Sequence, residues 1–137
     1  MKYWLIKSEP GTYSWENLVA DGETAWTGVR NYAARLNLLA MKKGDLAFFY
    51  HSNEGLCVLG IAQIERENYS DPTDKEGRWI CVDLKPFRKL ENPVTLTEMK
   101  KVTALKQMDL LRIGRLSVSK VQKKEWEIIL KLGKAKI

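Results

Sequence analysis

The chain has 137 residues, of which 45% are hydrophobic and 29% are charged, with nine glycines and four prolines. This composition is typical of one globular domain, here residues 1–137, and excludes a disordered, collagen-like or low-complexity protein. Two cysteines and one histidine are too few for a disulfide framework or for a zinc site built from Cys and His. We therefore expect no metal site.

The net charge of +6 is unevenly placed along the chain. Residues 1–68 carry seven basic and eight acidic side chains, whereas residues 69–137 carry sixteen and nine. A basic half of this kind favours binding to a polyanion, of which nucleic acid is the commonest, although basicity can also serve solubility alone.

The first apolar run, Tyr3–Ile6, is four residues long, too short for a signal peptide or a membrane span. We expect no membrane partner and no secretion. With two unpaired cysteines, a reducing compartment is expected, which is the cytoplasm in a bacterium or the nucleus in a eukaryote.

The first third of the chain alternates one strand with helices. Residues 3–7 are aromatic and β-branched and are followed by Glu9-Pro10-Gly11, which predicts a strand that ends there. Ser14 is expected to cap a short helix that continues to Val19. Residues 23–27 predict a brief strand or a loop, and residues 29–41 predict a helix.

The middle of the chain carries the strongest strand pattern. Strands are predicted at residues 46–51 and 56–67, joined by a turn, with Gly60 marking a bulge or bend in the second. A further strand begins at Trp79 and continues past Pro86 towards Leu90. The cysteines Cys57 and Cys81 lie in strand patterns and are expected to be buried and inert.

The last third is mostly helical. Thr97 is expected to cap a short helix, residues 107–113 predict another, residues 116–119 a last short strand or loop, and residues 122–132 a final helix. Trp79 and Trp126 are expected in the core. The order of strand, helices, a run of strands and helices favours a mainly antiparallel α+β domain of five or six strands that can curl into a small barrel.

Motifs of catalysis and cofactor binding are absent from the sequence. It contains no GxGxxG, P-loop, HExxH or GxSxG pattern, so we expect no cofactor, no catalytic residues and no enzyme. His51 and Ser52 are neighbours, but adjacent strand residues point to opposite faces and are poorly placed to pair.

Residues 26–32 combine aromatic and polar side chains at the start of a predicted helix. Free backbone N–H groups and the helix dipole favour an anion there, and Arg30 adds a positive charge. The alternative is that Trp26 is a core residue and Arg30 a solvated or paired surface residue.

Residues 48–53 form a second such segment. Phe48, Tyr50 and Ser52 share one face of the predicted strand, and the other face carries Phe49, His51 and Asn53. The polar end can read a base edge while aromatic rings stack on the base. The alternative is a histidine with an ordinary structural partner, followed by an ordinary turn.

Several short sequence motifs, taken in their order along the chain, resemble those of the EVE domain family. The matching motifs are Tyr3-Trp4-Leu5 with Lys7-Ser8-Glu9-Pro10, residues 26–32 with Ala34-Arg35, Met41-Lys42 with Gly44-Asp45, Phe48 to Asn53, Tyr69 with Asp71-Pro72, Trp79 with Val82-Asp83, and Arg115-Leu116-Ser117-Val118. They span nearly the whole chain.

The resemblance implies a PUA-like fold, a small curled β-barrel flanked by helices, related to the YTH readers of methylated RNA. It also implies binding of a methylated or hydroxymethylated base in DNA or RNA, with that base flipped into an aromatic-lined pocket. Family members include readers of modified cytosine, and bacterial members serve as specificity modules of restriction systems.

The resemblance also assigns roles to residues of this chain. The base pocket would comprise Ser8, Glu9, Trp26, Asn31, Tyr32, Tyr50, His51, Ser52, Asn53, Leu116 and Ser117. Trp26 would stack on the base, one of Asn31, Ser52 and Asn53 would read its polar edge, and Arg30, Arg35 and Arg115 would hold phosphate.

The sequence departs from the family pattern before the last helix. Ser119-Lys120-Val121-Gln122 stands where a Pro-Leu-Thr start is usual, and Ser119 with Gln122 is expected to form a capping box. The loop over residues 69–78 is short, which would lower affinity if longer relatives hold nucleic acid with it.

Two other functions stay open at this point. One is an enzyme or small-molecule binder that acts on a modified nucleotide through the same pocket, with His51 as acid or base. The other is a protein-interaction domain without a nucleic-acid ligand. For the leading interpretation, the expected partner is single-stranded or distorted nucleic acid, bound by a monomer.

Overall fold

The computed structural model describes residues 1–135. Its strands are β1 (Tyr3–Ser8), β2 (Thr24–Ala25), β3 (Leu46–His51), β4 (Cys57–Ser70), β5 (Ile80–Thr95) and β6 (Val118–Val121). Its helices are α1 (Trp15–Asp21), α2 (Tyr32–Ala40), α3 (Leu96–Lys100), the 3-10 turn η1 (Thr103–Leu105), α4 (Asp109–Arg112) and α5 (Lys123–Leu132). No helix among these residues is long and apolar enough to cross a membrane.

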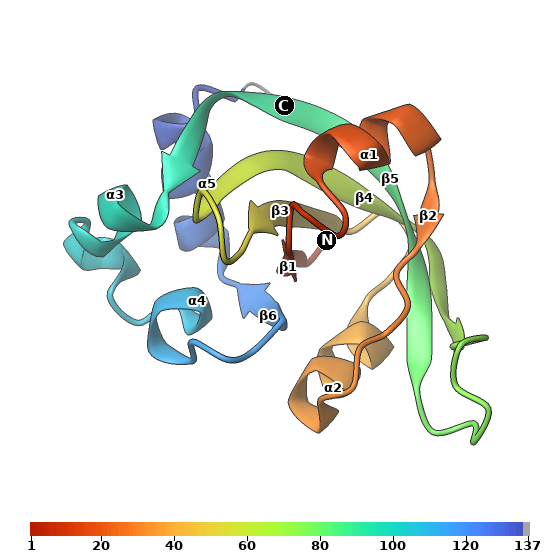
Figure 1. The fold of residues 1–137 in the computed structure, drawn as a ribbon. Coiled ribbons are helices and arrows are strands. Elements are labelled where there is room, and N and C mark those ends of the chain that lie inside the picture. Colours follow the sequence, from red (N-terminus) through yellow and green to blue (C-terminus); the bar gives the residue numbers. More distant parts are fainter. Residues whose placement is uncertain (136–137) are drawn as a thin grey trace.

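The strands form one curved sheet in the order β2-β5-β4-β3-β1-β6 (Figure 1). The β1–β3 pair is parallel, and the other four pairings are antiparallel. The predicted fold class, an α+β domain of mostly antiparallel strands flanked by helices, is confirmed, but the described strands do not close into the small barrel that was expected. Over the described residues the sheet stays open, with β2 and β6 as its edges.

The long β4–β5 pair curls because its register shifts at four places, and a further shift lies in the pairing of β4 with β3. Pairing with β3 jumps from Phe49–Gly60 to Tyr50–Val58, which leaves Leu59 as the extra residue of a bulge. Bulges increase local twist and bend a strand. At Gly60 a β-carbon would lie 2.6 Å from the indole of Trp15, so only glycine lets that ring pack on the strand. The bulge predicted at Gly60 is confirmed.

Both faces of the sheet are covered by helices (Figure 1). One face packs against α1 and α2 in a cluster that includes Trp4, Ile6, Trp15, Leu18, Leu38 and Phe49. The other packs against α3, η1, α4 and α5 in a cluster that includes Leu5, Phe48, Tyr50, Met99, Leu105, Leu110 and Trp126. Alternate strand residues therefore enter different cores, which explains the nearly continuous apolar runs of β1 and β3.

Four helix starts differ from the prediction, and that of α4 does so by two residues, at Asp109 instead of residue 107. Helix α2 begins at Tyr32 instead of residue 29, because the Asn31 side chain accepts the Ala34 N–H at 3.0 Å and caps it. Thr95, not Thr97, caps α3. Helix α5 follows Gln122, whose N–H donates to Glu125 Oε1 at 2.8 Å, whereas Ser119 lies inside β6; the expected Ser119–Gln122 capping box was wrong.

Burial agrees with the prediction at three of four residues. Trp126, Cys57 and Cys81 are buried, as expected. Trp79 is only half-buried, so its placement in the core was wrong. It follows the turn between β4 and β5 and packs on Tyr32 of α2 instead.

Candidate functional site

A cleft of about 580 Å³ opens where the end of β1, the turn after it, β2 and the segment before α2 meet. Its lining is mixed and includes two aromatic rings, the hydroxyl groups of three threonines, two basic groups and one carboxylate. The lining residues are Lys7, Ser8, Glu9, Thr12, Tyr13, Thr24, Ala25, Trp26, Thr27, Gly28, Val29, Arg30 and Ser117. A concave site that combines aromatic rings with convergent polar groups suits a ligand that has a flat face and a polar edge.

Trp26 is the aromatic centre of the cleft. It directly follows β2, and its N–H donates to Val82 O at 2.7 Å, which continues the strand pairing. The half-buried indole meets Tyr13 and Phe49 edge-on, at centroid distances of 5.8 and 5.7 Å. These contacts fix the ring before any ligand arrives, and the part that remains accessible belongs to the cleft.

The end of β1 supplies the polar wall. Ser8 is buried, and its hydroxyl donates to Tyr13 O, so it shapes the following turn. Lys7 Nζ donates to Gly114 O at 2.7 Å, and burial lowers the pKa of this amine. The side chain of Glu9 is exposed and has no hydrogen-bond partner among residues 1–135. The cleft therefore presents a tethered ammonium beside a free carboxylate.

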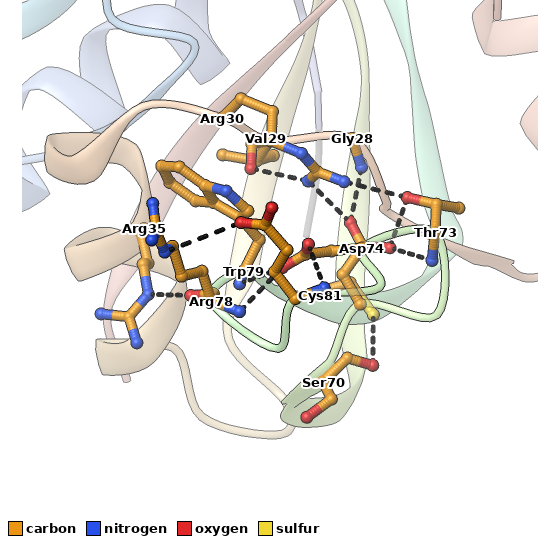
Figure 2. Close-up of polar contacts among 12 residues, drawn as sticks. Gly28, Val29, Arg30, Arg35, Ser70, Thr73, Asp74, Arg78, Trp79 and Cys81 are labelled. Atoms are coloured by element: carbon orange, nitrogen blue, oxygen red, sulfur yellow. Dashed lines mark hydrogen bonds and ion pairs between the residues drawn. The ribbon is translucent and has the colours of Figure 1, made fainter.

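Asp71 organises the other wall from beneath. Its fully buried carboxylate accepts hydrogen bonds from Gly28 N at 2.8 Å, Arg30 Nη1 at 3.0 Å, Thr73 N at 2.8 Å and Thr73 Oγ1 at 2.7 Å. Figure 2 labels the three residues that donate these bonds. Burial by itself raises the pKa of Asp71, but the hydrogen bonds from Thr73, Gly28 and Arg30 outweigh it and bring the pKa down to about 2. Gly28 has a φ of 85°, a conformation that favours glycine.

Arg30 joins the cleft to the β4–β5 turn. Besides Asp71, it donates to Val29 O and to Thr73 Oγ1, both at 3.1 Å, and its Cζ lies 5.8 Å from the centroid of the Trp79 ring. Its side chain is 39% exposed. The guanidinium is thus held in one orientation, with its charge partly balanced by a buried carboxylate.

Trp79 and Tyr32 lie beside the cleft and do not line it. Their rings pack at a centroid distance of 4.9 Å and an angle of 34°. Arg35 Nε donates to Arg78 O at 2.9 Å, and the Asp74 carboxylate accepts the N–H groups of Arg78 and Trp79, each at 2.8 Å (Figure 2). These hydrogen bonds from backbone N–H groups lower the pKa of Asp74, and the bond from Trp79 has the largest effect.

The structure brings five of the fourteen predicted site residues to the cleft. They are Ser8, Glu9, Trp26, Arg30 and Ser117. Tyr50 and Leu116 are buried in the cores, Tyr50 on the opposite face of the sheet from Trp26.

The other predicted site residues do not line the cleft. Ser52 and Asn53 occupy the turn after β3, where Ser52 N donates to Ser8 O at 2.8 Å. Asn31 caps α2, Tyr32 packs on Trp79, and Arg35 binds the Arg78 carbonyl. Arg115 is exposed and has no polar partner in the described part of the chain. Roles in binding for all these residues remain predictions.

His51 is engaged in a structural contact. Its Nε2 accepts the N–H of Trp15 at 3.0 Å, at the first residue of α1. That bond requires a neutral imidazole, and burial lowers the pKa of His51. Because the Nε2 lone pair is occupied, the geometry matches the structural alternative and does not favour a role in acid–base catalysis.

Several cleft residues were missed by sequence reasoning. Lys7 belongs to one of the matching motifs but was given no role in binding. Thr12 and Tyr13 lie in a turn that carries no recognisable motif. Asp71 also belongs to one of the matching motifs, but its partners Gly28 and Arg30 lie 43 and 41 positions earlier. A pattern within one segment carries no signal for such a contact.

Comparison with known proteins identifies the family. The profile of the EVE domain matches residues 2–132. Rat thymocyte nuclear protein 1 is 36% identical over 97% of this chain and 74% of its own length. A Rhodopseudomonas palustris protein solved by NMR is 49% identical with a TM-score of 0.93, covering 98% of this chain and 94% of that one.

A further solved structure is that of human THYN1 protein in complex with 5-methylcytosine-containing DNA. It is 34% identical with a TM-score of 0.90, and the match covers 100% of both chains. Profile, sequence and fold agree over nearly the whole length, and the chain belongs to the EVE domain family.

Proposed function

We propose that this protein binds DNA and holds a modified base, of the 5-methylcytosine class, in the cleft around Trp26. The observation that carries the proposal is a preformed cleft with a fixed indole, in a chain whose fold matches a human relative solved with 5-methylcytosine-containing DNA. In this account the base leaves its stack and enters the cleft, where Trp26 covers one face.

The polar wall suits the edge of a cytosine. Its exocyclic amine is a donor, which the free carboxylate of Glu9 can accept. Its ring nitrogen and carbonyl are acceptors, which the Lys7 ammonium and the Ser117 hydroxyl can serve. The methyl group of a modified base would find apolar contacts with Ala25 and Val29.

The phosphate contacts divide among the arginines according to their partners. Arg30 is committed to Val29, Asp71 and Thr73, so its main contribution is to position the wall of the cleft. Arg115 is exposed and lies two residues before Ser117 of the cleft, which suits a backbone contact. Salt would weaken that contact and leave recognition of the base largely unchanged.

The energies favour a single-stranded or distorted substrate. Extracting a base from a duplex costs a few kcal/mol, least when the base is already unpaired. Stacking on an aromatic side chain returns about 1–3 kcal/mol per base. With only Trp26 assigned to stacking on the base and a net charge of only +6, a base that is already unstacked is the better ligand.

The test compares variants of Trp26 in binding to a fluorescent single strand with one 5-methylcytosine. Trp26→Leu keeps an apolar side chain but removes the aromatic face, and we expect affinity to fall about 5- to 150-fold. Trp26→Phe should lose less. Phe87→Leu, a matched change at an exposed ring outside the cleft, should have no effect. Wild-type affinity and preference in folded Trp26→Leu protein would contradict the proposal.

A further inference from the structure

An exposed aromatic pair lies next to the cleft. Tyr32 is 63% exposed although its ring packs on Trp79 at a tilt of 34°, and Trp79 is itself only half-buried. Burial of such rings normally contributes much to stability, so a pair of packed rings left partly open to solvent offers an aromatic surface to a ligand. We refer to these two rings as the Tyr32–Trp79 platform.

The platform is rigid on both sides. Tyr32 is the first residue of α2, directly after the Asn31 cap. Trp79 is held by its N–H bond to Asp74, and Arg35 ties α2 to the same turn through the Arg78 carbonyl (Figure 2). A rigid aromatic surface loses little entropy when a flat ligand stacks on it.

The platform is continuous with the cleft through Arg30. This residue lines the cleft, and its guanidinium carbon lies 5.8 Å from the centroid of the Trp79 ring. Residues 26–32 therefore lead directly from the base-stacking ring of the cleft to the exposed ring of the platform. A strand with one base against Trp26 would pass Arg30 and reach Tyr32 with a neighbouring nucleotide.

Two cations beside the platform are available to phosphate. Arg35 uses only Nε, and its Nη groups have no partner in the described residues. Arg78 has one ion pair, with Glu76 at 3.9 Å, and the two side chains are 67% and 74% exposed. Such an exposed pair is weak and easily exchanged for a phosphate. Aromatic faces beside basic side chains are the usual means of holding single-stranded nucleic acid.

We propose that the Tyr32–Trp79 platform is a second stacking site, which binds the unpaired base next to the modified one on the same DNA strand. The inference rests on the proposed function, because it takes the modified base to be in the cleft. It separates two tasks: the cleft selects the modification, and the platform adds affinity without selecting sequence, since every base has a stacking face.

The experiment is a double-mutant cycle between protein and DNA. The strands are five-nucleotide DNAs with a central 5-methylcytosine or cytosine, either intact or with an abasic site on the 5′ or the 3′ side of the centre. Affinities are measured by fluorescence anisotropy for wild type and Tyr32→Ala. Tyr32→Phe tests whether the ring suffices, and Leu36→Ala, at a residue of α2 that is 64% exposed, is the matched control.

We expect Tyr32→Ala to lower affinity for the intact strands about 5- to 150-fold and to leave the ratio between 5-methylcytosine and cytosine unchanged. An abasic site on one side should weaken wild type similarly and should cause little further loss in Tyr32→Ala. Tyr32→Phe and Leu36→Ala should bind like wild type.

Three results would overturn the platform. The first is that Tyr32→Ala binds the intact strands as tightly as wild type. The second is that Tyr32→Ala no longer prefers 5-methylcytosine to cytosine. The third is that each abasic site weakens binding by Tyr32→Ala as much as it weakens binding by wild type. Failure of the proposed function itself looks different: wild type would then show no preference for 5-methylcytosine, and Trp26→Leu would bind as wild type does.

Discussion

Replacing Asp71 with asparagine is expected to destabilise the wall of the cleft in a pH-dependent way. Asparagine keeps the size of the side chain but removes the charge that accepts hydrogen bonds from Gly28, Arg30 and Thr73. An amide also has only one acceptor oxygen, so its NH₂ group must face a donor. The change therefore affects the contact that fixes residues 28–30 against the β4–β5 turn.

The magnitude follows from the pKa of Asp71. Hydrogen bonds bring it from the ordinary value of 3.8 to about 2 in the folded protein, despite the opposing effect of burial. A difference of this size corresponds to about 2 kcal/mol of stability. Because the folded pKa is the lower one, this stability is fully present above about pH 4 and is lost as the pH falls towards 2.

Urea unfolding of wild type and Asp71→Asn at pH 7, 5, 4 and 3 measures the effect. We expect a loss of about 2 kcal/mol at pH 7 and 5, and a smaller difference at pH 3. Asp109→Asn, which removes the acidic partner of Arg112 on the surface of α4, is the control and should cost about 0.5 kcal/mol or less. A difference for Asp71→Asn that is near zero at pH 7, or that stays constant down to pH 3, would refute this reasoning.

Three further substitutions test the scaffold around the cleft. Burial lowers the pKa of His51, so the stability of the wild type should decline as the pH falls below about 6.5. His51→Gln keeps an acceptor for the Trp15 N–H and should lose this pH dependence in urea titrations at pH 7.5 and 5.5. The same change in stability between the two pH values in variant and wild type would contradict this expectation. Gly60→Ala should lower the free energy of unfolding by about 1–3 kcal/mol because the new methyl group meets the Trp15 ring, whereas Gly114→Ala, with nothing within 4 Å, should be neutral. Asn31→Ala should cost about 1 kcal/mol in thermal unfolding and Asn31→Asp much less, since Asn31 caps α2; equal losses would argue against capping.

The strands were predictable because their signal is local. Residues 46–51 were predicted as a strand and form β3 with the same limits, since both faces of that strand are buried and every residue fits the pattern. The bulge at Gly60 was likewise marked by a glycine inside a strand. Helix α2 was misplaced by three residues because apolar periodicity did not reveal that Asn31 caps it.

The candidate site was less predictable, because neighbouring residues of one sequence motif can lie on opposite faces of a sheet. Tyr50 and His51 stand together in the sequence, but Tyr50 enters one core and His51 contacts α1 on the other side. Trp79 was misassigned because its partner Tyr32 lies 47 positions earlier in the chain. Such contacts are set by the tertiary fold, which places the β4–β5 turn against α2.

Recognition of a modified base is tested most directly by the affinity of the purified protein for two single-stranded oligonucleotides, identical except for one 5-methylcytosine, at two salt concentrations. We expect tighter binding to the methylated strand, with a ratio that persists at the higher salt because the cleft reads the base. Equal binding to both strands that disappears at the higher salt would contradict it, since that behaviour is produced by basic side chains alone.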